Sequence, residues 1–152
     1  MKKIAGVLLS CAAMLGVAAG ASAQPQFEKA EDAIKYRQSA LALMGAHSGG
    51  LAPIMRGRVP FDAEQVKAEV AILQSLAGLP WKAFGEGTEG GNSKPEVWQD
   101  SAKFQQAAQT MRENVAKLAE AADTGDFDKI RAAYADTGAS CKACHDSFRQ
   151  RR

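Results

Sequence analysis

Apolar residues recur at helical spacing along most of the chain, and the first such stripe begins at residue 27. Its members are Phe27, Ala30, Ile34, Leu41 and Met44. Steps of three, four and seven residues place side chains on one face of a helix, so an amphipathic helix is predicted over about 28–47. Gly49, Gly50 and Pro53 weaken the pattern, and the helix is expected to end, bend or continue irregularly there.

A second helix is predicted to begin at Asp62, whose side chain can cap it while Gln65 reaches back to the cap. Its apolar face consists of Val66, Val70, Leu73 and Ala77. The helix is expected to stop around residues 78–80. From residue 80 to residue 95 the chain is rich in glycine and carries aromatic residues, which predicts a long loop that packs on the rest of the protein or has a function.

The third stripe is the most regular, and a helix is predicted to run through it from near Pro95. Its positions are Val97, Ser101, Phe104, Ala108, Met111, Val115, Leu118 and Ala122. The run 123–125 is predicted to end this helix, and Asp126 to cap a last one. That last helix carries Phe127, Ile130, Tyr134, Thr137, Cys141, Cys144, His145 and Phe148 on one face. Four amphipathic helices without a strand pattern predict an all-α fold, an antiparallel up-down-up-down four-helix bundle.

The last helix contains the motif Cys141-Lys142-Ala143-Cys144-His145. Two cysteines three residues apart can each form a thioether with a vinyl group of one porphyrin, and the histidine that follows can ligate its iron. The alternatives are half of a zinc site, a redox pair or a structural disulfide. A zinc site needs a second pair of ligands, and a redox pair is expected beside a βαβ pattern. The motif therefore favours one covalently bound haem c.

Arg37 falls on the apolar stripe of the first helix, between Ile34 and Leu41. A permanent charge on a core stripe is unfavourable unless an anionic or hydrated group meets it, and the propionates of a haem would do so. The alternative is an arginine that extends along the edge of the stripe into solvent. Because the last helix carries the ligands and the first carries this arginine, the haem is expected between these two helices.

Residues 1–23 have the pattern of a secretory signal peptide, with Lys2 and Lys3, an apolar run over 4–19 and the small-residue site Ala21-Ser22-Ala23. One domain, 24–152, is expected to remain after cleavage. The apolar run is short for a membrane span, and lipidation at Cys11 is the weaker alternative. The remaining chain balances 17 basic against 17 acidic side chains, which argues against a nucleic acid as partner.

The chain resembles the cytochromes c′, a family of class II c-type cytochromes, along the whole length of the predicted domain. The resemblance rests on YRQSAL at 36–41, on LPWKAFG at 79–85 with TEGG at 88–91, and on GASCKACH at 138–145. It implies a periplasmic protein, commonly a homodimer, that is a haem protein and not an enzyme. Nitric oxide, and carbon monoxide more weakly, would be its small gas ligands, and one-electron exchange with an unknown redox partner is a further role.

The resemblance also implies a five-coordinate, high-spin iron with His145 as its one axial protein ligand and a distal pocket at Leu41. Related six-coordinate cytochromes carry a methionine at the position of Leu41, and leucine does not ligate iron. Met44 lies three residues further along the stripe. The alternative function is therefore a dedicated six-coordinate, low-spin electron carrier in which Met44 or another group completes the iron, although methionine is also a common core residue.

The remaining family roles fall on five positions. The resemblance places Arg37 and Gln38 near the propionates, Glu89 and Asn92 over the haem edge, and Arg149 in the proximal pocket. Arg149 follows the histidine of the motif by four residues, one helical turn, although a solvated charge at the helix end is an equal alternative. An enzyme that reduces nitric oxide is disfavoured, because no acid or base is placed beside the predicted distal site, and His47 is expected at the surface.

Overall fold

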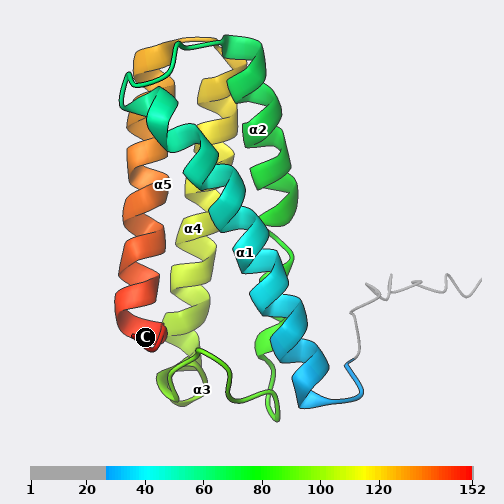
Figure 1. Cartoon of the computed structure of the whole chain (residues 1–152). Helices are drawn as coiled ribbons and strands as arrows, with labels where there is room; N and C mark the ends of the chain where they lie inside the picture. The colour runs from blue at the N-terminus through cyan, green and yellow to red at the C-terminus, as the bar shows by residue number, and fades with distance from the viewer. Residues whose placement is uncertain (1–26, 152) are drawn as a thin grey trace, which may run out of the picture.

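Four long helices form the bundle in the computed structural model, which describes residues 27–151. In chain order the elements are α1 (Ala30–Met55), α2 (Ala63–Leu76), the 3₁₀ helix η1 (Pro80–Phe84), α3 (Glu96–Gln99), α4 (Ser101–Asp123) and α5 (Phe127–Phe148). Helices α1, α2, α4 and α5 alternate in direction (Figure 1), which confirms the predicted all-α four-helix bundle. Within the described range, extended pairing is limited to one bridge between Ser93 and Arg149. The predicted signal peptide and Cys11 lie outside the described residues.

Helix α1 is longer than the predicted 28–47 and continues through Gly49, Gly50 and Pro53 as far as Met55. Buried apolar residues beyond the glycines account for the extra turns: they are Leu51, Ile54 and Met55, all members of the main core. Tertiary packing of an apolar face stabilises a helix more than local propensity does, so these contacts outweigh the weak sequence.

The predicted start of α2 is confirmed. The Gln65 backbone N–H donates to the Asp62 carboxylate at 3.0 Å. The expected face of the helix, with Val66, Val70 and Leu73, is buried in the main core.

The third helix is not continuous, which corrects the prediction of one helix from near Pro95. It is divided into α3 and α4 at Asp100, whose φ of −123° and ψ of 53° are not helical. Contacts with the loop after η1 and with α5 hold the α3 turn off the axis of α4. Trp98 Nε1 donates to the Gly85 carbonyl at 3.0 Å, and Val97 packs with Phe148 of α5. A short aspartate side chain, which competes with helical backbone bonding, suits the break.

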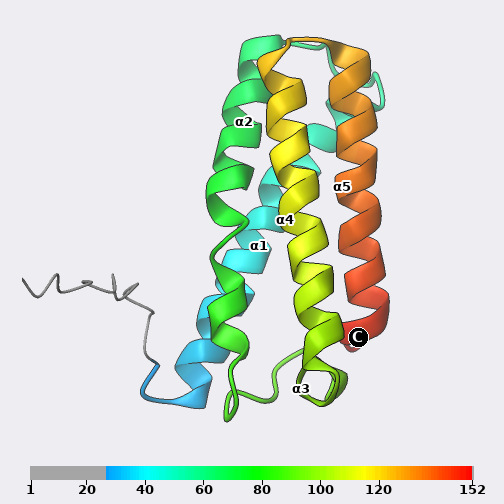
Figure 2. The ribbon, with the colours of Figure 1, turned by 180° about the vertical axis from the view of Figure 1, so that it is seen from behind.

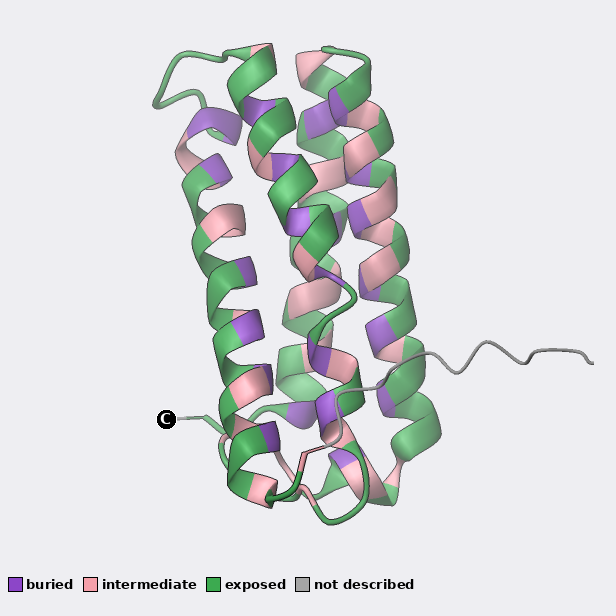
Figure 3. Ribbon diagram, turned by 90° about the vertical axis from the view of Figure 1, so that its right-hand side faces the viewer, coloured by how far each residue is buried: buried purple, intermediate pink, exposed green. Residues whose placement is uncertain are grey.

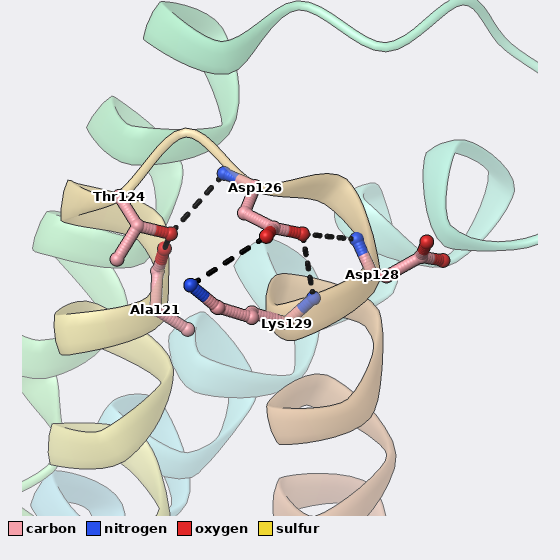
Figure 4. Close-up of polar contacts among 5 residues, drawn as sticks. All are labelled: Ala121, Thr124, Asp126, Asp128 and Lys129. Atoms are coloured by element: carbon pink, nitrogen blue, oxygen red, sulfur yellow. Dashed lines mark hydrogen bonds and ion pairs between the residues drawn. The ribbon is translucent and has the colours of Figure 1, made fainter.

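The predicted cap of α5 is present (Figure 4). The Asp126 carboxylate accepts the backbone N–H groups of Asp128 at 3.0 Å and Lys129 at 3.2 Å. Gly125 turns the chain between α4 and α5 with a φ of +67°, a left-handed conformation that favours glycine. These bonds satisfy backbone donors that have no partner inside the helix.

The Asp126→Ala variant is expected to be less stable than the native protein, and the difference should disappear in acid. The pKa of the Asp126 carboxyl is lowered, chiefly by the hydrogen bond from the Lys129 N–H. A carboxyl whose pKa is lower in the folded than in the unfolded protein stabilises the fold fully at pH values above its unfolded pKa of about 3.9. This stabilisation is lost as the pH falls through the pKa of the folded protein. Thermal unfolding across this range measures the effect. The exposed mid-helix variant Asp136→Ala is the control, and an equal loss in both variants would contradict the cap.

The four helices pack closely except where α1 and α5 diverge. Helix α4 packs against α5 and α2, whereas α1 packs against α2 and η1. Tyr134 of α5 donates its hydroxyl to the Ser48 carbonyl of α1 at 2.9 Å, and from this point the two helices diverge toward the end where the C-terminus lies (Figures 1 and 2). Buried positions face the interior along each helix (Figure 3). No helix in the range 27–151 combines the length and apolar character that a membrane crossing requires.

Candidate functional site

A cavity of about 530 Å³ lies where α1 and α5 diverge. Its walls come from α1, η1, the loop before α3, α3, α4 and α5, so most of the chain's elements contribute to it. Cofactor and ligand pockets have volumes of roughly 300–1,000 Å³ and mostly apolar linings. The cavity therefore has a suitable size and position for a prosthetic group between the first and last helices.

Cys141, Cys144 and His145 all line this cavity from α5. Their positions one helical turn or less apart put three side chains on one face, as the motif predicts. Both cysteines are free thiols and half-buried. Two thiols and an imidazole therefore lie along one wall of the cavity. These are the groups that a covalent haem requires, two for its thioethers and one as a ligand of its iron.

The electrostatics of the two thiols do not fit a redox pair. Burial raises the pKa of Cys141, and burial together with the charge of Cys141 raises the pKa of Cys144 to about 11. Reactive redox cysteines have lowered pKa values, because a nearby cation or helix N-terminus stabilises the thiolate.

The zinc alternative lacks its remaining ligands. Among residues 27–151 no group of three His, Cys, Asp or Glu side chains is arranged to hold a metal ion. His47, the other histidine, donates from Nδ1 to the Glu69 carboxylate at 2.7 Å, away from the cavity. It is half-buried between α1 and α2, so the expected surface position is only partly correct.

His145 is exposed as a residue, and it lines the cavity, where its imidazole is partly desolvated. This desolvation lowers the pKa of His145, as does the positive charge of Arg149, whereas Asp146 acts in the opposite direction. A neutral imidazole is the form that binds a metal. The local environment of His145 therefore favours the ligating form.

Arg37 is buried, with 1% of its surface exposed, so the alternative of an arginine extended into solvent is wrong. Its Nη1 donates to the Ala83 and Thr88 carbonyls, each at 2.7 Å, and Nη2 donates to the Gly90 carbonyl at 3.0 Å. One guanidinium thus satisfies three carbonyl groups, one in η1 and two in the loop that follows it. These polar partners explain how a permanent charge is accommodated on an apolar stripe.

Aromatic rings complete the surroundings of Arg37. Its guanidinium carbon lies 4.6 Å from the centre of the Phe84 ring and 5.4 Å from that of Trp98. The pKa of Arg37 is lowered by burial and raised by the charge of Glu89. The side chain lines the cavity, and a propionate as a further partner stays a prediction.

The other predicted positions are distributed around the same cavity. Gln38, Leu41, Asn92 and Arg149 line it, whereas Glu89 does not, and the Glu89 carboxylate instead accepts the Gly87 N–H at 3.2 Å. Gly91 and Gln38 are in close contact: a Cβ at Gly91 would lie 2.8 Å from Gln38 Nε2, and its φ is +62°. This crowding explains the glycine in the loop.

The predicted rival ligand, Met44, also lines the cavity, but its side chain is 7% exposed and belongs to the main core. Several further wall residues were not predicted as part of the site, among them Trp81, Phe104 and Met111. The sequence did offer a signal for the loop residues among them, since a long glycine-rich loop that carries Trp81 and Phe84 suggests packing or function. Trp81 is fixed by its Nε1, which donates to the Ala77 carbonyl at 2.6 Å.

A four-helix bundle with a cavity lined by two cysteines and a histidine from one helix defines a class II c-type cytochrome. The family model described as Cytochrome C' matches residues 32–149. The chain therefore belongs to the cytochrome c′ family, and its cofactor is one covalently bound haem c, for which Cys141 and Cys144 occupy the attachment positions.

Two curated relatives are similar to nearly all of the described part. The chain is 56% identical over 127 residues to the cytochrome c′ of Alcaligenes xylosoxydans xylosoxydans, covering 84% of this chain and 100% of that protein. It is 45% identical over 129 residues to the cytochrome c′ of Rubrivivax gelatinosus, covering 83% and 100%. A solved nitric oxide complex of a leucine-to-alanine mutant of cytochrome c prime from Alcaligenes xylosoxidans superposes with a TM-score of 0.82 at 54% identity, covering 84% of this chain and 100% of that one.

Proposed function

We propose that this cytochrome c′ binds small diatomic gases, nitric oxide and more weakly carbon monoxide, at a haem iron that has His145 as its one protein ligand. The observation that carries the proposal is Leu41, an apolar side chain without ligating atoms on the α1 wall of the cavity. Bound haem would supply the iron to which the gas binds. The nitric oxide complex formed by the similar protein supports the same chemistry here.

The first experiment is the visible spectrum of the purified ferrous protein, alone and under carbon monoxide. A broad high-spin Soret band that sharpens and shifts when the gas is added is expected. Sharp low-spin α and β bands that the gas does not alter would overturn the proposal. That result would favour the electron carrier in which Met44, which lines the cavity, completes the iron. The Met44→Leu variant would then become high-spin.

Leu41 is proposed to restrict the space over the iron, so that ligands are selected by size. The Leu41→Ala variant is expected to bind carbon monoxide about tenfold more tightly, corresponding to ~1.4 kcal/mol of relieved crowding. Equilibrium titration of the ferrous protein with the gas measures the change. Leu79→Ala is the control, because it makes the same change at a leucine that is 41% exposed and does not line the cavity. Unchanged affinity in Leu41→Ala would remove crowding as the explanation.

The same proposal includes export and assembly. Residues 1–23 have the charged start, apolar run and cleavage site of a signal peptide, which supports a periplasmic location with haem attached after export. Exposed apolar side chains on α1 and α2, among them Leu43 and Ile72, support a homodimer through these helices. One-electron exchange is a second proposed role of the haem. The α1 residues that line the cavity around Leu41 include no carboxylate or histidine that could transfer a proton to a bound gas, which supports a binding role over an enzymatic one.

A further inference from the structure

We propose that four cationic side chains at the open end of the bundle form a docking surface for an acidic protein that exchanges one electron with the haem. These residues, here called the basic cluster, are Lys94, Lys142, Arg149 and Arg151. The inference rests on the one-electron role included in the proposed function, and it adds the site and the chemistry of the partner.

The basic cluster is assembled by a contact between the end of α5 and the segment before α3. The Lys94 N–H donates to the Phe148 carbonyl and the Gln150 N–H to the Asn92 carbonyl, both at 2.9 Å. Lys94 Nζ reaches the backbone carbonyl of Asp146 at 2.8 Å, although the two residues are 52 positions apart in the chain. These bonds fix Lys94 beside the cations of the C-terminal segment, so the charges are held together by the backbone.

One carboxylate faces the basic cluster. Lys142 pairs with the Asp146 carboxylate, and Lys94 Nζ donates to the backbone carbonyl of the same residue at 2.8 Å. Arg151 directly follows Gln150, whose N–H is bonded to the segment that carries Lys94. Asp146 cannot neutralise several cations. Glu96 is close in sequence to Lys94 but forms no ion pair with the basic cluster among the described residues.

The rest of the described chain has the opposite charge. Apart from the basic cluster and Asp146, residues 27–151 contain 12 Lys and Arg against 16 Asp and Glu. Several of those cations are paired, including Lys67 with Asp123 and Arg131 with Asp128. The four cations and Asp146 therefore form a local patch of net positive charge, on a chain whose other described side chains carry an excess of acid. Such a patch orients an approaching acidic partner and accelerates its association.

The basic cluster adjoins the cavity on the side of the iron ligand. Arg149 lines the cavity together with His145, and so does Ser93, the neighbour of Lys94. A partner bound here would be close to the prosthetic group. The transfer moves one electron from the reduced partner to the ferric iron, which becomes ferrous while the partner is oxidised by one electron. No bond forms or breaks.

Stopped-flow reduction of the ferric holoprotein tests the inference with two small reagents, anionic iron(II)–EDTA and cationic hexaammineruthenium(II). The rate with the anionic reagent is expected to fall as salt rises and the rate with the cationic reagent to increase. The double variant Lys142→Glu/Arg151→Glu should reduce the low-salt rate with iron(II)–EDTA about tenfold. The control Arg58→Glu/Lys117→Glu makes the same change of net charge at two exposed cations, one in the connection between α1 and α2 and one in the last two turns of α4, and should have little effect. Equal effects of both variants, or no salt dependence, would overturn the inference.

Retention of the holoprotein on a sulfonate cation exchanger provides a second readout that is independent of iron coordination. The cluster variant should elute at lower salt than the control variant, although the two have equal net charge. Identical elution would contradict an oriented basic surface. Because neither readout depends on carbon monoxide binding, a protein that fails the gas-binding test can still pass this one, and the reverse also holds.

Discussion

Replacement of both Cys141 and Cys144 by serine is expected to abolish the covalent retention of haem. The two thiols line the cavity beside His145, and each would form one thioether to the same porphyrin. Haem staining after denaturing electrophoresis should show no haem in the double variant. Each single variant should retain haem through its one remaining thioether, at a lower level.

The exposed residue Ser147 lies on the same helix, and the Ser147→Ala variant is the control that should stain as strongly as the native protein. Mass spectrometry of the intact variants gives the same result independently, since each attached haem adds its own mass. Haem that remained bound in the denatured double variant would contradict the assignment of these cysteines as the attachment sites.

The Arg37→Met variant is expected to lose about 3 kcal/mol of unfolding free energy, the largest stability effect predicted for a single substitution. The change leaves the carbonyls of Ala83, Thr88 and Gly90 without their shared donor. A buried polar group without a partner costs roughly 1–3 kcal/mol, and partial access of water to the loop reduces the total for three groups. Denaturant unfolding of the holoprotein, followed by far-ultraviolet circular dichroism, measures the loss.

Two further variants separate the loop contacts from general helix effects. Lys35→Met changes an exposed cation on the same helix and should alter stability by less than about 0.5 kcal/mol. Arg37→Lys retains the charge but lacks the planar fork that reaches several carbonyls, so its stability should be intermediate. If Arg37→Met were as stable as Lys35→Met, the guanidinium would not organise the loop.

The bonds of Arg37 and of Tyr134 divide the bundle into an open half and a closed half. In the closed half, the Tyr134 hydroxyl joins α5 to α1 at Ser48. In the open half, Arg37 joins α1 to η1 and the loop, and residues of α1 and α5 line the cavity. The loop and the cavity are therefore coupled through one buried side chain, which links the stability of the fold to the shape of the haem site.

The sequence by itself determined the features that depend on neighbours along the chain. The stripes of apolar residues predicted the four long helices, because helical periodicity is local. The caps at Asp62 and Asp126 were predicted for the same reason, since each side chain bonds backbone N–H groups within three residues of it. The spacing of Cys141, Cys144 and His145 determined the haem attachment motif, and Arg37 was recognised as a charge that needed polar partners.

Only the tertiary structure decided the features that depend on distant residues. Helix α1 extends past Gly49 and Gly50 because Leu51 is buried by other helices, and the third helix breaks at Asp100 because α3 is held by the loop and α5. The partners of Arg37 are carbonyls about 50 positions away, which no local pattern specifies. Lys94 joins the cations of α5 for the same reason: backbone pairing between two remote segments, set by the packing of the bundle, determines which charges become neighbours.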